Sequence, residues 1–324
     1  MAGYFLGVDL GGTKILTAVA DEQGKILARK KLPTEANRGN DRVIENIIET
    51  IRSVLAEVGL KKENIVRMGV GSPGPLNTKE GIIYLAPNLG WENVPISRIL
   101  EDRTGISVIL ENDANAAALG EKWFGAGQGI DNLIYITVST GIGGGIIIDR
   151  KIYHGVNDGA GEVGHMVIDP DGPLCGCGNH GCFEALASGT AISRRGREAV
   201  ERGEKTLLTD LCEGDLNKID GGLIARAAQL GDQVALDIWS EAGYYLGLGF
   251  ANLVNIFDPE MLILGGGVMK AGELIMEPML ASLKNYSFKS AFNSLKIRQA
   301  ALGDDTGVKG AIAVAMGDRL YREG

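Results

Sequence analysis

The stretch GVDLGGTK, residues 7–14, combines the end of a strand with a glycine turn. It closes an apolar strand expected over residues 4–10 and leads into two further expected strands, ILTAVAD (15–21) and KILARKKL (25–32). Two glycines at such a turn let backbone amides approach an anion without an intervening side chain. The stretch lacks the Gly-Lys-[Ser/Thr] ending of a P-loop, and its glycines lead into a strand, which excludes P-loop and dinucleotide-binding patterns. A plain β-hairpin turn remains the alternative to an anion site.

A second glycine-rich stretch, STGIGGG (139–145), occurs in the same context. The order strand, glycine turn, strand, turn, strand is expected over 4–32 and again over 133–153, with GIGGG as the second turn. Two related halves are therefore predicted, and facing hairpins would hold a polyphosphate between them. Asp9 would then be placed to hold Mg²⁺ through water. The glycines at 265–267, which follow the apolar strand MLIL, suit close approach by a base or a ribose.

Helical patterns alternate with these strands, so the chain is predicted to be an α/β protein. Apolar residues recur at helical spacing over about 41–58, and Asn112 or Asp113 is expected to cap a helix that begins in the alanine run. The predicted domains are an N-terminal α/β domain, 1–115, and a larger C-terminal α/β domain, 116–305. The C-terminal helix, 306–324, is expected to pack back on the first domain.

Composition excludes several classes of partner. The 324 residues carry a formal net charge of −9 and an isoelectric point near 5.0, which gives no general attraction to nucleic acid or anionic lipid. The sequence shows neither a signal peptide pattern nor an apolar run of transmembrane length, so we expect a cytoplasmic location and no membrane partner. Arg194, Arg195 and Arg197 are interpreted as a solvated helix face.

The segment CGCGNHGC, residues 175–182, holds three of the four cysteines of the chain. In a reducing compartment, cysteines clustered in a glycine-rich turn favour a metal site over disulfides, and a structural Zn²⁺ takes four tetrahedral ligands. Cys175, Cys177 and Cys182 provide three, and spacing alone leaves His165 and His180 as rivals for the fourth. Reduced buried cysteines are the alternative. The fourth cysteine, Cys212, is expected to be a buried apolar residue.

Six motifs, in order along the chain, resemble those of the ROK family of sugar kinases and, within it, the bacterial glucokinases. They are DLGGTK (9–14), ENDANAAALGE (111–121), STGIGGGI (139–146), GAGEVGH (159–165), CGCGNHGCFEALAS (175–188) and LGGGV (264–268). The resemblance runs from one end of the chain to the other. It implies an actin-like, ribonuclease H-like fold with two domains and an interdomain cleft.

The resemblance also implies an activity, the transfer of the γ-phosphoryl group of MgATP to the 6-hydroxyl of glucose. Asp113 is then the catalytic base, although the residues alone favour a helix cap there. The implied sugar-binding residues are Gly74, Asn88, Asn112, Asp113, Glu162, His165 and Glu184. The implied residues for ATP and Mg²⁺ are Asp9, Gly11, Gly12, Thr13, Lys14, Thr140, Gly141, Gly143, Gly265, Gly266 and Gly267. The implied ligands of a structural zinc are His165, Cys175, Cys177 and Cys182.

Alternatives remain within this family. The sugar could be fructose, mannose, N-acetylglucosamine or N-acetylmannosamine, and polyphosphate could replace ATP. A sugar-responsive transcriptional regulator is a rival, but the first glycine motif begins at residue 9, which leaves no room for a preceding helix-turn-helix. A homodimer or homotetramer is expected from the resemblance.

Overall fold

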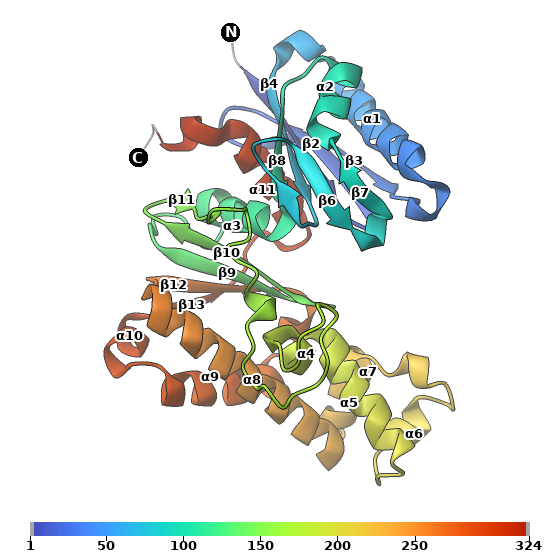
Figure 1. The fold of residues 1–324 in the computed structure, drawn as a ribbon, viewed down its shortest axis with the longest axis vertical. Coiled ribbons are helices and arrows are strands. Elements are labelled where there is room, and N and C mark those ends of the chain that lie inside the picture. Colours follow the sequence, from blue (N-terminus) through green and yellow to red (C-terminus); the bar gives the residue numbers. More distant parts are fainter. Residues whose placement is uncertain (1–2, 322–324) are drawn as a thin grey trace. The chain divides into compact units, whose positions relative to one another are not determined.

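The computed structural model describes residues 3–321 and divides them into two compact units (Figure 1). The first unit comprises the described residues up to 135, residues 145–161, and those from 299 onward. The second comprises residues 136–144 and 162–298. The domain ranges drawn from the sequence stay a prediction, and their outer ends, residues 1–2 and 322–324, lie outside the described residues. Within 3–321, no helix is long and apolar enough to cross a membrane.

The first unit is built on a five-stranded sheet in the order β3-β2-β1-β4-β8. Strand β1 pairs antiparallel with β2 and parallel with β4, and β4 pairs parallel with β8. The carboxyl ends of β1, β4 and β8 therefore share one edge of the sheet. The strands are β1 (Tyr4–Leu10), β2 (Lys14–Ala20), β3 (Ile26–Pro33), β4 (Ile65–Ser72) and β8 (Val108–Asn112). A small antiparallel sheet follows β4, made of β5 (Leu76–Asn77), β6 (Ile82–Ala86) and β7 (Trp91–Val94).

Helices cover both faces of the first sheet (Figure 1). Helices α1 (Asn40–Glu57) and α2 (Ile96–Thr104) pack on one face, and α11 (Thr306–Met316) packs on the other, beside α3 (Asp113–Phe124). Helix α1 forms as predicted, because its apolar residues recur at intervals of three and four and share one buried face. That face consists of Val43, Ile44, Ile47, Ile48, Ile51 and Val54.

The second sheet has the order β11-β10-β9-β12-β13, and its first three strands repeat the arrangement of β3, β2 and β1. The predicted repetition of a strand meander is thus present in the fold. The strands are β9 (Leu133–Val138), β10 (Ile142–Ile148), β11 (Lys151–Ile152), β12 (Met261–Gly265) and β13 (Lys296–Gln299). The second unit carries the helices α4 (Phe183–Ala187), α5 (Gly189–Glu201), α6 (Leu208–Leu211), α7 (Gly221–Gln229), α8 (Gln233–Phe257), α9 (Glu273–Tyr286) and α10 (Lys289–Ser294).

Two sequence interpretations are wrong. The glycine run 143–145 was expected in a turn, but it lies inside β10. At Gly145 a β-carbon would lie 2.9 Å from the Ala114 carbonyl oxygen, so glycine there lets α3 pack against the strand.

Arg195 is not on a solvated face. It is 9% exposed, donates to the Leu186 carbonyl at 2.7 Å and pairs with Glu241 at 3.0 Å.

Close packing of α11 on β1 generates a first prediction. A β-carbon at Gly7 would lie 2.7 Å from the Val308 carbonyl oxygen and 2.8 Å from the Ile312 nitrogen, and neither backbone atom can move aside cheaply. Gly7→Ala is therefore expected to lower the free energy of unfolding by about 1–3 kcal/mol in urea denaturation. Gly159→Ala, which meets open space, is the control and should change it by less than about 0.5 kcal/mol. Equal effects would contradict the packing argument.

Candidate active site

Two carboxylates lie at the shared edge of the first sheet. Asp9 is the penultimate residue of β1, and Asp113 directly follows the end of β8, as the first residue of α3. Because β4 separates β1 from β8 and all three run parallel, both side chains emerge at the same edge. The sheet topology thus brings together two residues that are 104 positions apart in the sequence.

The two carboxylates disfavour each other's charge. Burial, followed by the nearby charge of Asp113, raises the pKa of Asp9 to about 6, and Lys14 only partly offsets the rise. Although the Asp113 side chain is open to solvent, partial desolvation raises its pKa too, against hydrogen bonds from backbone amides. A carboxylate with a raised pKa is a better proton acceptor, and a divalent cation at Asp9 would relieve the repulsion between the pair.

Asn112, not Asp113, is the main cap of helix α3. Its Oδ1 accepts the backbone N–H groups of Ala114 and Asn115 at 2.9 and 3.2 Å, which leaves one Asp113 oxygen outside the cap. Asp113 Oδ1 accepts the Ala114 N–H at 2.7 Å. The Asn112 side-chain nitrogen also lies close to Gly74, 3.7 Å from where a β-carbon would be. Three predicted sugar-binding residues therefore lie close together in the first unit.

The predicted phosphate hairpin is a tight turn between β1 and β2. Its Gly11 N–H donates to the Lys14 carbonyl at 3.0 Å, and Thr13 is exposed at the tip. The side chain of Asn88, on the short helix η3 (Pro87–Leu89), lies against Gly12, and a β-carbon there would be 2.8 Å from Asn88 Cβ. A predicted sugar-binding residue and the predicted phosphate turn are therefore in contact.

Thr34 supports this hairpin through two hydrogen bonds. It is fully buried, its hydroxyl donates to the Gly11 carbonyl at 2.6 Å, and its N–H donates to the Thr13 carbonyl at 3.0 Å. Both acceptors are turn carbonyls, so the two bonds leave the turn's remaining amides free to face outward.

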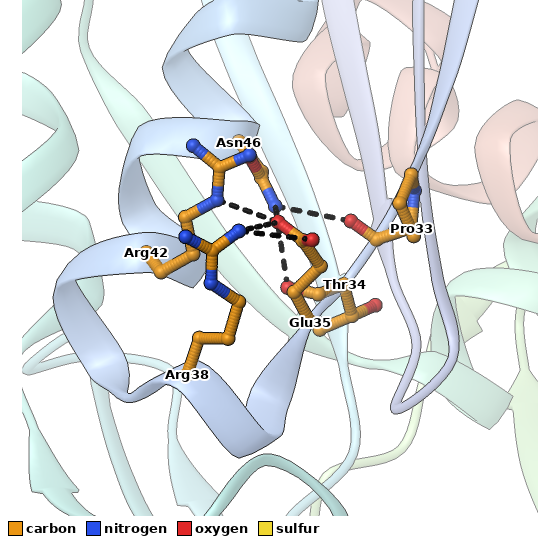
Figure 2. Close-up of polar contacts among 6 residues, drawn as sticks. All are labelled: Pro33, Thr34, Glu35, Arg38, Arg42 and Asn46. Atoms are coloured by element: carbon orange, nitrogen blue, oxygen red, sulfur yellow. Dashed lines mark hydrogen bonds and ion pairs between the residues drawn. The ribbon is translucent and has the colours of Figure 1, made fainter.

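The next residue, Glu35, anchors Thr34 (Figure 2). Glu35 has a left-handed backbone, φ 56°, which disfavours non-glycine residues by about 1 kcal/mol. Its carboxylate accepts hydrogen bonds from Arg42 at 2.6 Å, Arg38 at 3.2 Å and Asn46 at 3.3 Å, and these hold the pKa of Glu35 down at about 2, Arg42 contributing most. Asn46 also donates to the Pro33 carbonyl at 3.1 Å. The start of α1 thus fixes the chain that supports the hairpin.

In the second unit, the turn between β9 and β10 holds Thr140 and Gly141. Glu184, on α4, accepts the Ile142 N–H at 2.8 Å, and its carboxylate lies directly against Gly141, where a β-carbon would collide with it. The Thr140 carbonyl accepts the hydroxyl of Thr190 at 2.8 Å. A predicted sugar residue and the second predicted phosphate turn are therefore in contact here as well. Gly143 lies beyond the turn, in β10.

A cavity of about 500 Å³ opens beside this turn. The N-termini of α5 and α7 border it, with Ser188 and Asp220 as their caps, and helix N-termini favour anionic groups. Of the predicted nucleotide residues, Thr140 and Gly267 line it. Gly265 ends β12, and Gly266 follows with a positive φ of 93°, packed on the backbone of Val138.

Several cavity residues were not predicted from the sequence. They are Thr190, Arg197, Asp220, Gln229 and Lys270. They come from three separate elements and share no motif, although the helix caps Ser188 and Asp220 could have located two of those elements. Arg197 was interpreted as part of a solvated face; it is half-buried and also lines the cavity.

The cysteine-rich segment and the GEVGH turn meet in one cluster. One ligand atom from each of four residues lies within 4.8 Å of the other three, namely those of His165, Cys175, Cys177 and Cys182. Cys177 Sγ lies 3.6 Å from Cys182 Sγ, and Cys175 Sγ lies 3.7 Å from His165 Nδ1. A tetrahedron of Zn–S bonds has edges of about 3.8 Å, so the donor set fits a structural zinc.

His180 and Glu162 lie outside this cluster. His180 is exposed, and its Nδ1 lies 3.1 Å from the Gly172 carbonyl oxygen. Glu162 immediately precedes the short helix η4 (Val163–His165) and is exposed. Cys212 is buried, as predicted.

Comparison with known protein families matches residues 5–318 to the ROK family. The chain belongs to the ROK family. Among curated proteins, this ROK protein is 40% identical to the glucokinase of Thermotoga maritima over 95% of the chain and 96% of that protein. It is 39% identical to the glucokinase of Halalkalibacterium halodurans, over 95% and 93%. The xylose repressor of Bacillus subtilis is 30% identical, over 97% of this chain but 77% of the repressor.

Solved structures of two family members have the same fold. The ROK family glucokinase from Streptomyces griseus, crystallised with glucose and AMPPNP, is 38% identical with a TM-score of 0.79, over 99% of this chain and 100% of that one. The ROK hexokinase from Thermus thermophilus is 37% identical with a TM-score of 0.82, over 96% and 98%. The predicted actin-like α/β fold of this ROK protein is thereby confirmed.

The support of the hairpin by Thr34 generates a second prediction. Thr34→Val keeps the shape and removes the hydroxyl, so the free energy of unfolding should fall by about 1 kcal/mol and amide exchange at residues 10–14 should accelerate. Thr104→Val is the matched control, because its hydroxyl donates to the Leu100 carbonyl at 2.7 Å far from the hairpin. It should cost similar stability and leave exchange at 10–14 unchanged. Unchanged exchange in Thr34→Val would remove the supporting role.

Proposed function

We propose that this ROK protein is an ATP-dependent glucokinase that transfers the γ-phosphoryl group of MgATP to the 6-hydroxyl of glucose. The observation that carries the proposal is the pairing of Asp9 and Asp113 at one sheet edge, with the pKa of both carboxylates raised. A hydroxyl nucleophile needs a proton acceptor, and a transferred phosphoryl group needs a cation nearby, so the pair meets both needs. The 38–40% identity to glucokinases over nearly the whole chain supports the choice of sugar.

The proposed mechanism assigns each group one task. Asp113 accepts the proton of the 6-hydroxyl as its oxygen attacks the γ-phosphorus, and the bond from that phosphorus to the bridging oxygen of ADP breaks. Asp9 would hold Mg²⁺, and the ion would supply positive charge to neutralise the phosphate oxygens. The turns at Gly11–Gly12 and Thr140–Gly141 donate backbone amides to the phosphates. The cavity bordered by α5 and α7 receives the nucleoside.

The sugar ring has its own proposed partners. Gly74, Asn88, Asn112 and Asp113 come from the first unit, and Glu162, His165 and Glu184 from the second. Carboxylates, amides and imidazole offer the directional hydrogen bonds that a ring of hydroxyls requires. A zinc ion held by His165 and the three cysteines would fix the segment that leads to Glu184.

The sugar is tested by a coupled assay with ATP against glucose, fructose, mannose, N-acetylglucosamine and N-acetylmannosamine. The highest kcat/KM is expected with glucose. A higher value with an N-acetylhexosamine would contradict the assignment of the sugar while leaving the reaction class intact. Turnover of none of the five would contradict the proposed function.

Asp113 is tested by replacement with asparagine. Asp113→Asn is expected to lower kcat by about 10²–10⁴-fold, because the proton acceptor is lost, and to leave glucose binding measurable by calorimetry. Asp41→Asn is the matched control, because Asp41 is an exposed acidic residue in the first turn of α1, as Asp113 is in α3. It should leave kcat unchanged. If Asp113→Asn turns over at the rate of the unsubstituted protein, Asp113 acts only at the helix start.

The zinc proposal is tested by elemental analysis. About one zinc ion per chain is expected, lost in Cys177→Ser because three remaining ligands hold the ion far more weakly than a closed tetrahedral set. Cys212→Ala is the control, since Cys212 lies outside the cluster, and it should keep its metal. A purified protein that is free of metal and fully active would overturn the proposal.

A further inference from the structure

Glu111 is a buried carboxylate directly before Asn112 and Asp113, the two residues called here the catalytic turn, and it has no task in the proposed mechanism. It lies in β8, one residue before Asn112, and is 5% exposed. Its Oε1 accepts the Asn112 N–H at 3.0 Å and the side-chain amide of Asn115 at 3.1 Å. Its Oε2 lies 2.8 Å from Nε2 of His154. One carboxylate thus holds the backbone of the turn, the first turn of α3 and a distant histidine.

His154 begins a loop that is fastened at two points within the first unit. It follows β11, and its carbonyl accepts the Ala160 N–H at 3.1 Å, which closes the loop 154–160. Within the loop, Asp158 accepts the N–H of Thr78 at 3.1 Å and its hydroxyl at 3.0 Å. Thr78 follows β5, in the segment that begins at Gly74. The loop therefore joins the catalytic turn to the Gly74 segment.

The same loop leads directly into the GEVGH motif. Two residues after Ala160 the chain reaches Glu162, and His165 follows three residues later. A displacement of the loop would therefore be transmitted along the chain to two predicted sugar-binding residues. Misplacement of reacting groups by about 1 Å can lower the rate about 10²-fold, so a displacement of this loop should produce a measurable loss of rate.

We propose that Glu111 and His154 are positioning residues of the sugar site, holding the Asn112–Asp113 turn and the loop before Glu162 in one arrangement. The inference rests on the proposed function for its kinetic readout. Neither residue touches the reacting atoms in this arrangement, and both act through Asn112, Asp113 and the loop. Because Glu111 is buried, removal of His154 would lower the stability of the turn, since the carboxylate would be left without its partner.

The pair has a pH signature. The hydrogen bond to Glu111 and then the charges of Glu111 and Asp158 raise the pKa of His154, while desolvation and Lys79 lower it. A histidine with a raised pKa gives its full contribution below its ordinary value near 6.5 and loses it as the pH rises through the raised value. The bond should therefore weaken on the alkaline side.

The test compares His154→Ala, His154→Gln and a control on the same segment. His154→Ala should lower kcat/KM for glucose by about 10–100-fold and leave KM for MgATP within twofold. His154→Gln keeps a donor and should restore most of the activity at pH 7 but lose the alkaline decline of kcat/KM. Lys151→Ala, an exposed change on β11, should match the unsubstituted protein. An active protein in which His154→Ala stays within twofold for glucose would overturn the inference.

A readout without turnover separates this inference from the proposed function. Amide exchange should accelerate in both 112–116 and 154–161 in His154→Ala, and in Glu111→Gln to a lesser degree. This result is expected whether or not the protein phosphorylates glucose. Exchange that rises in 154–161 alone, with 112–116 unchanged, would show that the loop and the catalytic turn are not coupled. If His154→Ala does not fold, exchange in the unsubstituted protein is compared with that in His154→Gln at pH 6 and at pH 9. The unsubstituted protein should then lose protection in both segments relative to His154→Gln at pH 9 only, and equal exchange at both pH values would overturn the inference.

Discussion

The proposed chemistry depends on two carboxylates, Asp9 and Asp113, which the sheet topology brings together at one edge. Parallel strands β1 and β8, with β4 between them, deliver Asp9 and Asp113 to one edge, where burial and the charge of Asp113 raise the pKa of Asp9, and desolvation raises that of Asp113. Carboxylates with perturbed pKa values cluster at functional sites. Here one carboxylate is suited to take a proton and the other to hold a cation, which are the two needs of phosphoryl transfer to an alcohol.

Much of the remaining site consists of residues that hold these groups in place. Thr34 ties down the first hairpin, and the next residue, Glu35, is held in place by Arg38 and Arg42 (Figure 2). Glu184 performs the same task for the second hairpin through the Ile142 amide. In each unit a predicted sugar-binding residue contacts a predicted phosphate turn, Asn88 at Gly12 and Glu184 at Gly141. Residues predicted for the sugar and for the phosphates are thus in contact at both turns.

The sequence predicted the parts whose signals are local. The spacing of apolar residues located α1 closely, and the change from strand to alanine run placed the start of α3 at Asn112 and Asp113. It failed where tertiary packing decides. The glycines of 143–145 were interpreted as a turn, because nothing in the sequence shows that α3 packs on β10. Arg197 has the pattern of a solvated helix residue, and only the fold reveals the cavity beside it. Likewise, Glu111 and His154 are 43 residues apart and share no motif.

The central claim is that the γ-phosphoryl group of ATP moves to the 6-hydroxyl of glucose at the Asp9–Asp113 edge. Phosphorus-31 and carbon-13 NMR of the reaction products measure this most directly, because they report which oxygen carries the new ester. We expect ADP and a single sugar phosphate with the phosphorus coupled to carbon 6. Free phosphate without an ester, or an ester on the anomeric oxygen, would contradict it.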